Sequence, residues 1–309
     1  MAHLGNPVAA PVPAGGGEGA GQGSSRYNGR MNADLHCHST ASDGTLSPTA
    51  LAQRAAAGGV THWALTDHDV LAGLTEARAA AFACGIAFVP GVEVSVTWRG
   101  QTIHIVGLGV DPDNPILAAG VAATRGSRQA RAARMAERLD ALGMPGALAG
   151  ALALVDDPDL VSRTHFARYL MAQGHARVMG EVFDRWLGDG KPAYVAQQWA
   201  ELDDAVAWIR AAGGAAVIAH PGRYRLSHGA MDGLIEQFRA AGGVGIEVVT
   251  GSHSTDEYAT YAALAREHRL LASRGSDFHS PEESRIDLGA LPPLPPGVEP
   301  IWSVLAGCR

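Results

Sequence analysis

The stretch that decides the fold is residues 34–39, which read Asp-Leu-His-Cys-His-Ser. His36 and His38 are two residues apart in a segment that begins like a strand, so both imidazoles point to the same face and could bind one metal ion together. Asp277 and His279 repeat this spacing near the other end of the chain. Ligands from both ends of a chain meet where many strand ends share one rim, as they do in a closed β/α barrel.

Five more motifs of the same kind lie between these two ends. They are Ser-Asp-Gly at 42–44, Thr-Asp-His-Asp at 66–69, Gly-Val-Glu at 91–93, Ile-His-Ile at 103–105 and Ala-His-Pro at 219–221. Together the motifs hold nine potential metal ligands. A lone histidine is usually a satisfied polar group, but these stand in short strand-like runs beside a carboxylate or a second histidine. Such a set predicts a metal centre.

The cysteines do not extend this pattern. Cys37 is expected to point to the opposite strand face, and Cys84 and Cys308 are isolated, so the sequence has neither a CxxC pair nor a disulfide framework. Mixed imidazole and carboxylate ligands suit zinc, manganese or iron, and the sequence does not choose among them. Nine ligands exceed the needs of one ion, which predicts two or three ions in one pocket.

In the order and content of these motifs, the chain resembles the PHP (polymerase and histidinol phosphatase) domain family of metal-dependent phosphoesterases, from about residue 34 to residue 279. The resemblance implies a distorted (β/α)7 barrel, an α/β fold, with up to three divalent ions. Manganese is the expected metal, with zinc or iron as alternatives. The family's metal ligands fall on His36, His38, Asp43, His68, Glu93, His104, His220, Asp277 and His279.

The rest of the chain fits one barrel with an insertion. Residues 31–114 and 196–309 show alternating helix and strand signals, and we expect them to form the two parts of the barrel. Residues 115–195 read as successive helices, which predicts a small helical insertion that caps the site. Residues 1–30 are rich in Gly, Ala, Pro and Ser without apolar periodicity, so we expect a disordered tail.

Composition excludes several classes of protein. With 47% hydrophobic and 18% charged residues the chain reads as an ordinary globular enzyme. It has no signal-peptide pattern and no apolar run of membrane-spanning length, so we expect a cytoplasmic protein without a membrane partner. A net charge of −7 disfavours binding to duplex DNA, and a non-catalytic nucleic-acid-binding protein is kept only as an alternative of a different class.

Cationic residues in the predicted insertion are candidates for substrate binding. Arg128 and Arg131 are one helical turn apart, and Arg163 and His165 lie in a second basic stretch. They could form a solvated face, but arginine forks match phosphate oxygens, and we hypothesise that they bind a phosphate group. Asp67, beside His68, is expected to orient an imidazole, with a direct acid or base role as the alternative.

Within the family, the chain most resembles the stand-alone bacterial branch. Activities of that branch include removal of the 3′-phosphate from nucleoside 3′,5′-bisphosphates and 5′-to-3′ trimming of short RNA. The resemblance therefore implies a phosphorylated nucleotide or short RNA as substrate, cleaved by metal-bound hydroxide without a protein nucleophile. Histidinol phosphate, or another small phosphate ester, is the alternative substrate.

Overall fold

The computed structural model describes residues 1–2, 31–126 and 128–305. Apart from its first two residues, the tail expected to be disordered (1–30) lies outside these ranges, as does Cys308. The chain from Met31 onward forms one compact unit, and the fold below is that of this unit.

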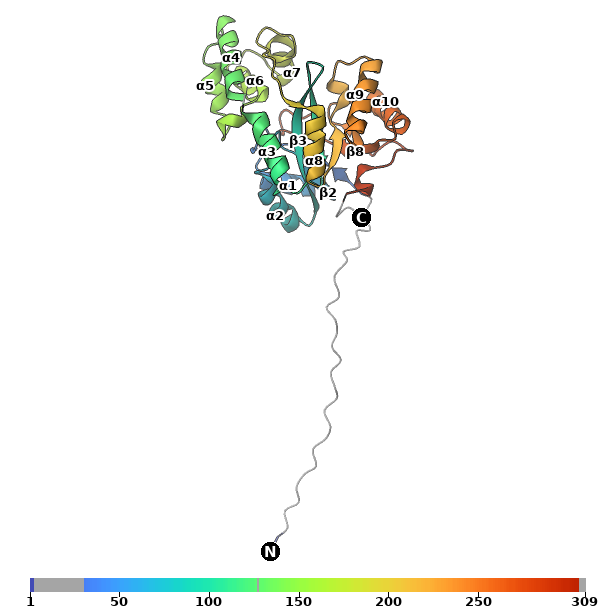
Figure 1. Ribbon diagram of the computed structural model, residues 1–309. Helices are drawn as coiled ribbons and strands as arrows, with labels where there is room; N and C mark the ends of the chain where they lie inside the picture. Colours follow the sequence, from blue (N-terminus) through green and yellow to red (C-terminus); the bar gives the residue numbers. More distant parts are fainter. Residues whose placement is uncertain (3–30, 127, 306–309) are drawn as a thin grey trace. The chain divides into compact units, whose positions relative to one another are not determined.

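A single sheet organises the described part of the chain (Figure 1). Its strands are hydrogen-bonded in the order β1-β2-β3-β4-β6-β7-β8, and the short β5 pairs with β3. The strands are β1 (Ala33–Asp34), β2 (His62–Leu65), β3 (Ala87–Trp98), β4 (Gln101–Leu108), β5 (Ala200–Glu201), β6 (Ala215–Ile218), β7 (Gly245–Thr250) and β8 (Leu271–Gly275). All neighbouring pairs are parallel except those of β4, which is antiparallel to both β3 and β6.

The two ends of this strand order meet and close the sheet. The backbone N–H of Leu35 donates to the Arg274 carbonyl at 3.0 Å, and Cys37 forms a parallel bridge with Phe278. The result is a nearly closed barrel, which confirms the fold expected from the motif order. Because the parallel strands all end at one rim, the loops that follow them lie close together.

Helices follow most of the strands, as the alternating pattern predicts. They are α1 (Pro48–Ala57), α2 (Leu74–Cys84), α3 (Pro115–Arg125), α4 (Arg128–Ala141), α5 (Ala147–Leu152), α6 (Arg163–Ala172), α7 (Met179–Val182), α8 (Leu202–Ala211), α9 (His228–Ala240) and α10 (Thr255–Glu267). Helix α1 begins with a side-chain cap, because the Ser47 side chain accepts from the Ala50 N–H and Pro48 occupies the first turn. None of the helices in the described ranges is long and apolar enough to cross a membrane.

The barrel interior is filled by small and branched side chains below the rim. Val89 of β3, Val106 of β4 and Val217 of β6 are all buried in one apolar cluster with Leu35. Side chains alternate along a strand, so Val106 shares its face with His104. The apolar interior layer therefore lies directly beneath the polar groups of the rim.

The helical segment 115–195 divides into two parts with different packing. Helix α3 belongs to the barrel, because Leu117 and Val121 join its main core and the Trp208 ring of α8 fills the space beside Gly120. The segment from Ala132 to Val195 has an apolar core of its own. Helices α4 to α7 gather together in Figure 1. Side-chain contacts from α4 and from the start and middle of α6 reach the rim; they include Arg128 with Asp69, Ser162 with Asp43 and Arg168 with Glu283.

Candidate metal centre

The segment after β1 places two imidazoles side by side and the intervening thiol away from them. The Nε2 atoms of His36 and His38 lie 3.1 Å apart, and both side chains are fully buried. Cys37 points into an apolar cluster, where its Sγ atom donates to the Ala64 carbonyl at 3.3 Å. The spacing of two residues thus acts as predicted from the strand periodicity.

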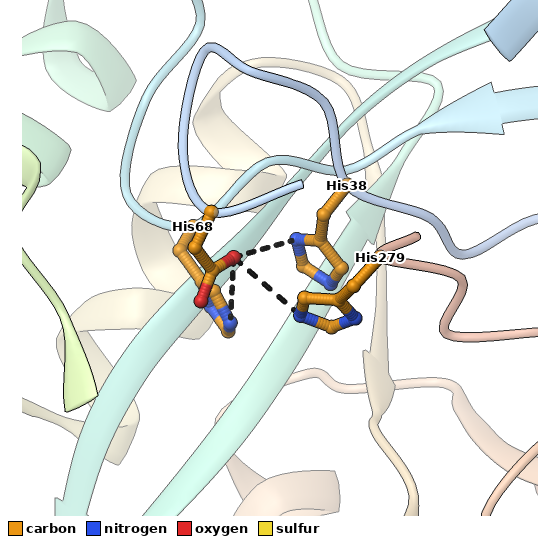
Figure 2. Close-up of side chains that lie close together, drawn as sticks. His38, His68 and His279 are labelled. Carbon is orange, nitrogen blue, oxygen red and sulfur yellow. Dashed lines mark ion pairs between the residues drawn. The ribbon is translucent and has the colours of Figure 1, made fainter. Parts of the chain in front are cut away.

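A first group of ligand atoms surrounds one oxygen of Asp43. The Asp43 Oδ1 atom lies 3.4 Å from His279 Nε2 and 4.0 Å from both His38 Nδ1 and His68 Nε2. Figure 2 shows these three imidazoles directed at the same carboxylate oxygen. The four residues come from three separate loops of the rim, and their ligand atoms all lie within 4.8 Å of one another.

Glu93 links this group to the opposite side of the barrel. Its Oε2 atom lies 3.0 Å from His68 Nδ1 and 3.3 Å from His36 Nε2, while Oε1 lies 2.9 Å from both His104 Nδ1 and His220 Nε2. Asp277 completes the set, with Oδ1 at 3.3 Å from His38 Nε2 and 3.5 Å from His36 Nε2. All nine predicted side chains therefore converge, in four overlapping groups that share members.

His104 reaches this cluster differently from the loop residues. It lies inside β4, opposite Ser95 of β3, and β4 runs against the direction of its neighbours. Its position near the start of the strand therefore brings it to the rim at which the parallel strands end. The sequence pattern predicts His104 as a ligand but does not predict the reversed strand that delivers it.

Many of the clustered atoms are buried without a hydrogen-bond partner. Among the described residues these include His38 Nδ1, Asp43 Oδ1, His68 Nδ1, Glu93 Oε2 and Asp277 Oδ1. A buried polar atom without a partner costs about 1–3 kcal/mol, and several in one cluster are rare in native proteins. Divalent cations bound by imidazole nitrogens and carboxylate oxygens would satisfy these atoms, so the residues fit such ions.

The charges in the cluster agree with this fit. Burial raises the pKa of Glu93, but His68 and His104 outweigh burial and hold it well below its ordinary value. Asp43 and Asp277 behave in the same way, with histidines as the opposing groups. Burial lowers the pKa of His38, yet Asp277 and Glu93 together raise it to about 10. The carboxylates are thus ionised and attract either protons on the imidazoles or metal cations.

Two glycines allow the rim loops to come this close. A Cβ atom on Gly44 would lie 2.1 Å from the His38 carbonyl oxygen, and one on Gly275 would lie 2.3 Å from His36 Cβ. Either contact is far below van der Waals distance, so a larger residue would push the ligand loops apart. Steric exclusion of a side chain therefore explains why the Ser-Asp-Gly motif ends in glycine.

Backbone strain is concentrated at the same rim. His220 has φ 26°, Asp277 has φ 55° and Asp69 has φ 53°, all in the left-handed region that non-glycine residues rarely adopt. Residues held in such conformations cluster at functional sites, where the surrounding contacts keep them in place. The strained backbone aims the side chains of His220 and Asp277 into the cluster.

Glu247 is a member of the site that the motif analysis missed. This buried carboxylate in β7 lies 2.8 Å from His36 Nδ1 through Oε1 and accepts from the His220 backbone N–H at 2.6 Å through Oε2. Its signal was present in the sequence, as a lone carboxylate in the otherwise apolar strand Gly-Ile-Glu-Val-Val. Buried carboxylates of this kind are almost always paired.

Asp67 was expected to orient an imidazole, but its hydrogen bonds among the described residues are to serines of the loop before it. Its carboxylate accepts from the Ser39 N–H at 2.7 Å, from the Ser39 hydroxyl at 2.6 Å and from the Ser42 hydroxyl at 2.5 Å. Asp67 therefore holds the loop that carries Asp43. Its neighbour Asp69 accepts from the Ser95 backbone N–H at 2.8 Å and contacts Arg128, so it joins β3 to helix α4.

A pocket beside the cluster carries three of the four predicted substrate-binding residues. Arg128, Arg131 and Arg163 line it together with Asp43 and His68. Arg128 is paired with Asp69, and the guanidinium groups of Arg128 and Arg131 lie 4.9 and 5.4 Å from the Trp199 ring centroid. The pocket has a volume of about 80 Å³.

Arg131 differs from the other two in having no carboxylate ion-pair partner among the described residues. Arg163 pairs with Asp189 at 3.0 Å, whereas Arg131 donates from its Nε to the Val195 carbonyl at 2.9 Å. Burial, aided by Arg163 and Arg128, lowers the pKa of Arg131 to about 9. An anion in the pocket would relieve this accumulation of positive charge.

His165 does not line this pocket, contrary to expectation. Its Nδ1 atom accepts from the Ser162 backbone N–H at 3.0 Å, which completes a capping box at the start of α6. The ring is buried, and burial lowers its pKa to about 4. His165 thus fixes the end of a helix, a role that histidine shares with glutamate and glutamine at this position.

Comparison with known proteins places the chain in a family. Residues 34–142 match the model of the PHP domain. A Chromobacterium violaceum protein named 3′,5′-nucleoside bisphosphate phosphatase is 52% identical, over 89% of this chain and 96% of its own length. The 5′-3′ exoribonuclease Rnm of Escherichia coli is 44% identical, over 88% of this chain and 92% of its own length.

Solved structures give the same picture of the fold. A Chromobacterium violaceum protein described as an amidohydrolase, with bound sulfate and no metal, has a TM-score of 0.86 and 52% identity over 88% of this chain and 95% of its own. A Bifidobacterium adolescentis protein, described as a candidate metal-dependent phosphoesterase, has a TM-score of 0.73 and 28% identity over 89% of this chain and 94% of its own.

Proposed function

Because the chain belongs to the PHP domain family of metal-dependent phosphoesterases, we propose that it cleaves the ester between the 3′-oxygen of a 5′-phosphorylated nucleoside and the attached phosphate. The substrates would be nucleoside 3′,5′-bisphosphates and short 5′-phosphorylated RNA, and the enzyme would act in the cytoplasm. The observation that carries the proposal is the position of Arg131 in the pocket beside the nine clustered side chains. This arginine is buried and has no carboxylate ion-pair partner in the part of the chain that the structure describes.

The two activities named for the relatives break the same type of bond. Hydrolysis of a 3′,5′-bisphosphate at its 3′-phosphate leaves a nucleoside 5′-phosphate. Removal of the first nucleotide from the 5′ end of RNA leaves the same product, because the bond broken again joins that nucleotide's 3′-oxygen to phosphorus. A site that holds the 5′-phosphate in one place and the scissile phosphate in another therefore serves both reactions.

The nine clustered side chains would hold two or three divalent ions, with manganese as the proposed metal. Bound ions would supply charge neutralisation and a water of lowered pKa for attack on phosphorus. The chain's own residues arrange the site around them. Glu247 orients His36, Asp67 holds the loop of Asp43, and Arg223 donates to Asp277 Oδ2 at 2.9 Å.

The 5′-phosphate would bind to Arg131 and its neighbours in the adjoining pocket. Arg131 is buried and Arg128 is held by Asp69, so both are ordered before substrate arrives. Binding energy from a phosphate that does not react can be used at the reacting centre, which favours bisphosphates over simple monoesters. Histidinol phosphate has a single phosphate and would leave the arginine pocket empty.

A substrate panel tests the proposal. Release of phosphate or nucleotide would be measured with added manganese from adenosine 3′,5′-bisphosphate, a 5′-phosphorylated tetraribonucleotide, histidinol phosphate and an aryl phosphate. We expect the first two to be cleaved with much higher kcat/KM than the others. Preference for histidinol phosphate would assign the alternative function, and binding of RNA without any hydrolysis would indicate a non-catalytic protein.

A further inference from the structure

A second and larger cleft begins at the same cluster. His104 and His220 line its inner end, and its walls come from the β3–β4 turn, from residues 183–194 and from residues 223–225. Its volume is about 530 Å³, against about 80 Å³ for the arginine pocket. Sites for small ligands commonly measure roughly 300–1,000 Å³, so this cleft is large enough for a nucleotide.

The walls of the cleft are cationic and aromatic. Four cationic side chains line it, against two carboxylates, in a chain whose net charge is −7. Arg163 and Arg223 already pair with Asp189 and Asp277. Lys191 and Arg225, by contrast, have no ion-pair partner among the residues that the structure describes. Their charges are available to an anion that enters the cleft.

Aromatic rings lie among these charges. Phe183 and Tyr194 line the cleft, with the Arg163 guanidinium 5.7 Å from each ring centroid. A groove that combines cationic side chains with aromatic surfaces is typical of sites for single-stranded nucleic acid, because the charges follow the phosphates and the rings stack with bases. The arginine pocket also joins cationic and aromatic side chains, but its smaller volume leaves room for a compact anion and not for a chain of nucleotides.

The chemistry of the proposed reaction requires such an opening, and the inference rests on the proposed function. In a 3′,5′-bisphosphate the scissile phosphate is terminal, whereas in RNA it carries the rest of the chain. We infer that this cleft binds the nucleotides on the 3′ side of the scissile phosphate of a single-stranded oligoribonucleotide. Lys191 and Arg225 contact the phosphates of that segment, and a bisphosphate does not reach them.

The double variant Lys191→Ala/Arg225→Ala tests this inference. With the manganese-loaded enzyme, kcat/KM for a 5′-phosphorylated tetraribonucleotide should fall by at least about tenfold, and its dependence on salt should become weaker. For adenosine 3′,5′-bisphosphate the change should stay below about twofold. The matched control is Arg78→Ala/Arg239→Ala, which removes two exposed arginines of α2 and α9 and should affect neither substrate.

A binding measurement separates this inference from the proposed function. Anisotropy of a 3′-labelled, 5′-phosphorylated tetraribonucleotide would be followed with metal-free protein, so that no turnover is needed. We expect weaker binding by the cleft variant than by the unaltered or control proteins. Equal binding by all three, or equal losses of kcat/KM on both substrates, would overturn the cleft assignment. If the unaltered enzyme cleaves neither substrate, the proposed function fails, while the binding comparison still decides the role of the cleft.

Discussion

The Nδ1 atom of His36 lies 2.8 Å from Oε1 of Glu247, and both groups are buried. This contact turns the other ring nitrogen of His36 toward the cluster. The second carboxylate oxygen of Glu247 holds the backbone N–H of His220, whose φ of 26° is strained. One carboxylate from β7 therefore sets the positions of two candidate ligands, which follow β1 and β6 in the chain.

Replacing Glu247 should weaken the metal centre without unfolding the barrel. Glu247→Gln removes the charge that favours His36 with its Nε2 free to ligate, and partners of this kind typically contribute about 10- to 100-fold to metal affinity or activity. We expect lower manganese content and lower kcat/KM, with an unchanged circular dichroism spectrum. Glu236→Ala, an exposed residue of α9, is the control. Full manganese content in Glu247→Gln would contradict the role given to this residue.

Replacing His38 should remove most of the activity. His38 belongs to two of the four ligand groups, so His38→Ala should lower the bound manganese per chain and reduce kcat/KM on the order of 100-fold or more. The increase in melting temperature on adding manganese should shrink as well, because that increase reflects metal binding to the folded state. His228→Ala, at an exposed site on α9, should behave as the unaltered protein. Retention of both manganese and turnover by His38→Ala would count against a shared metal centre.

Replacing Arg131 should discriminate between substrates with one and two phosphates. A lost charge-assisted contact is equivalent to about 2–3 kcal/mol, so Arg131→Ala should reduce kcat/KM for adenosine 3′,5′-bisphosphate by roughly 30- to 150-fold. An aryl monophosphate, which has no second phosphate, should lose little. Arg134→Ala, on the exposed face of the same helix, is the matched control. Equal losses on both substrates would show that Arg131 acts on the reacting phosphate or on the fold.

Acid should destabilise the helical segment of α4 to α7 through His165. Its pKa is about 4 in the folded protein and about 6.5 in an unfolded chain, so between these values the unfolded state binds the proton more readily. Stability present above pH 6.5 is therefore lost as the pH falls, by about 2 kcal/mol between pH 7.5 and pH 5. His165→Gln keeps an acceptor for the Ser162 N–H but cannot titrate. In urea unfolding of metal-free protein, the variant should lose about 2 kcal/mol less over this range; an identical pH dependence would refute the assignment.

The sequence predicted which nine side chains would converge better than it predicted the groups that support them. Pairs such as His36 and His38 can be recognised because residues two apart on a strand point to the same face. Glu247 and Asp67 were missed or misread because their partners are backbone N–H groups and hydroxyls of other loops, which no local spacing reveals. His165 was misjudged because it lies in the first turn of α6. There its ring completes a capping box with Ser162 and is not free to bind a phosphate.

The barrel itself could be predicted, but the direction of one of its strands could not. The alternating helix and strand signals of residues 196–309 agree with α8 followed by β6 and α9 followed by β7. The direction of β4 depends instead on the short turn at Arg99 and Gly100, where both residues have positive φ. A tight turn makes β4 antiparallel to β3, because a parallel neighbour needs a crossover of a dozen or more residues.

That turn has a consequence for how such enzymes can diversify. Glu93 and His104 lie within β3 and β4, so a deletion inside either strand would turn a ligand to the wrong face of the sheet. Residues added at the turn would leave both strands in register. Gly100 and Gln101, however, line the larger cleft. Insertions or substitutions at this hairpin turn can therefore alter which molecules enter the larger cleft. The clustered side chains at the barrel rim stay unchanged.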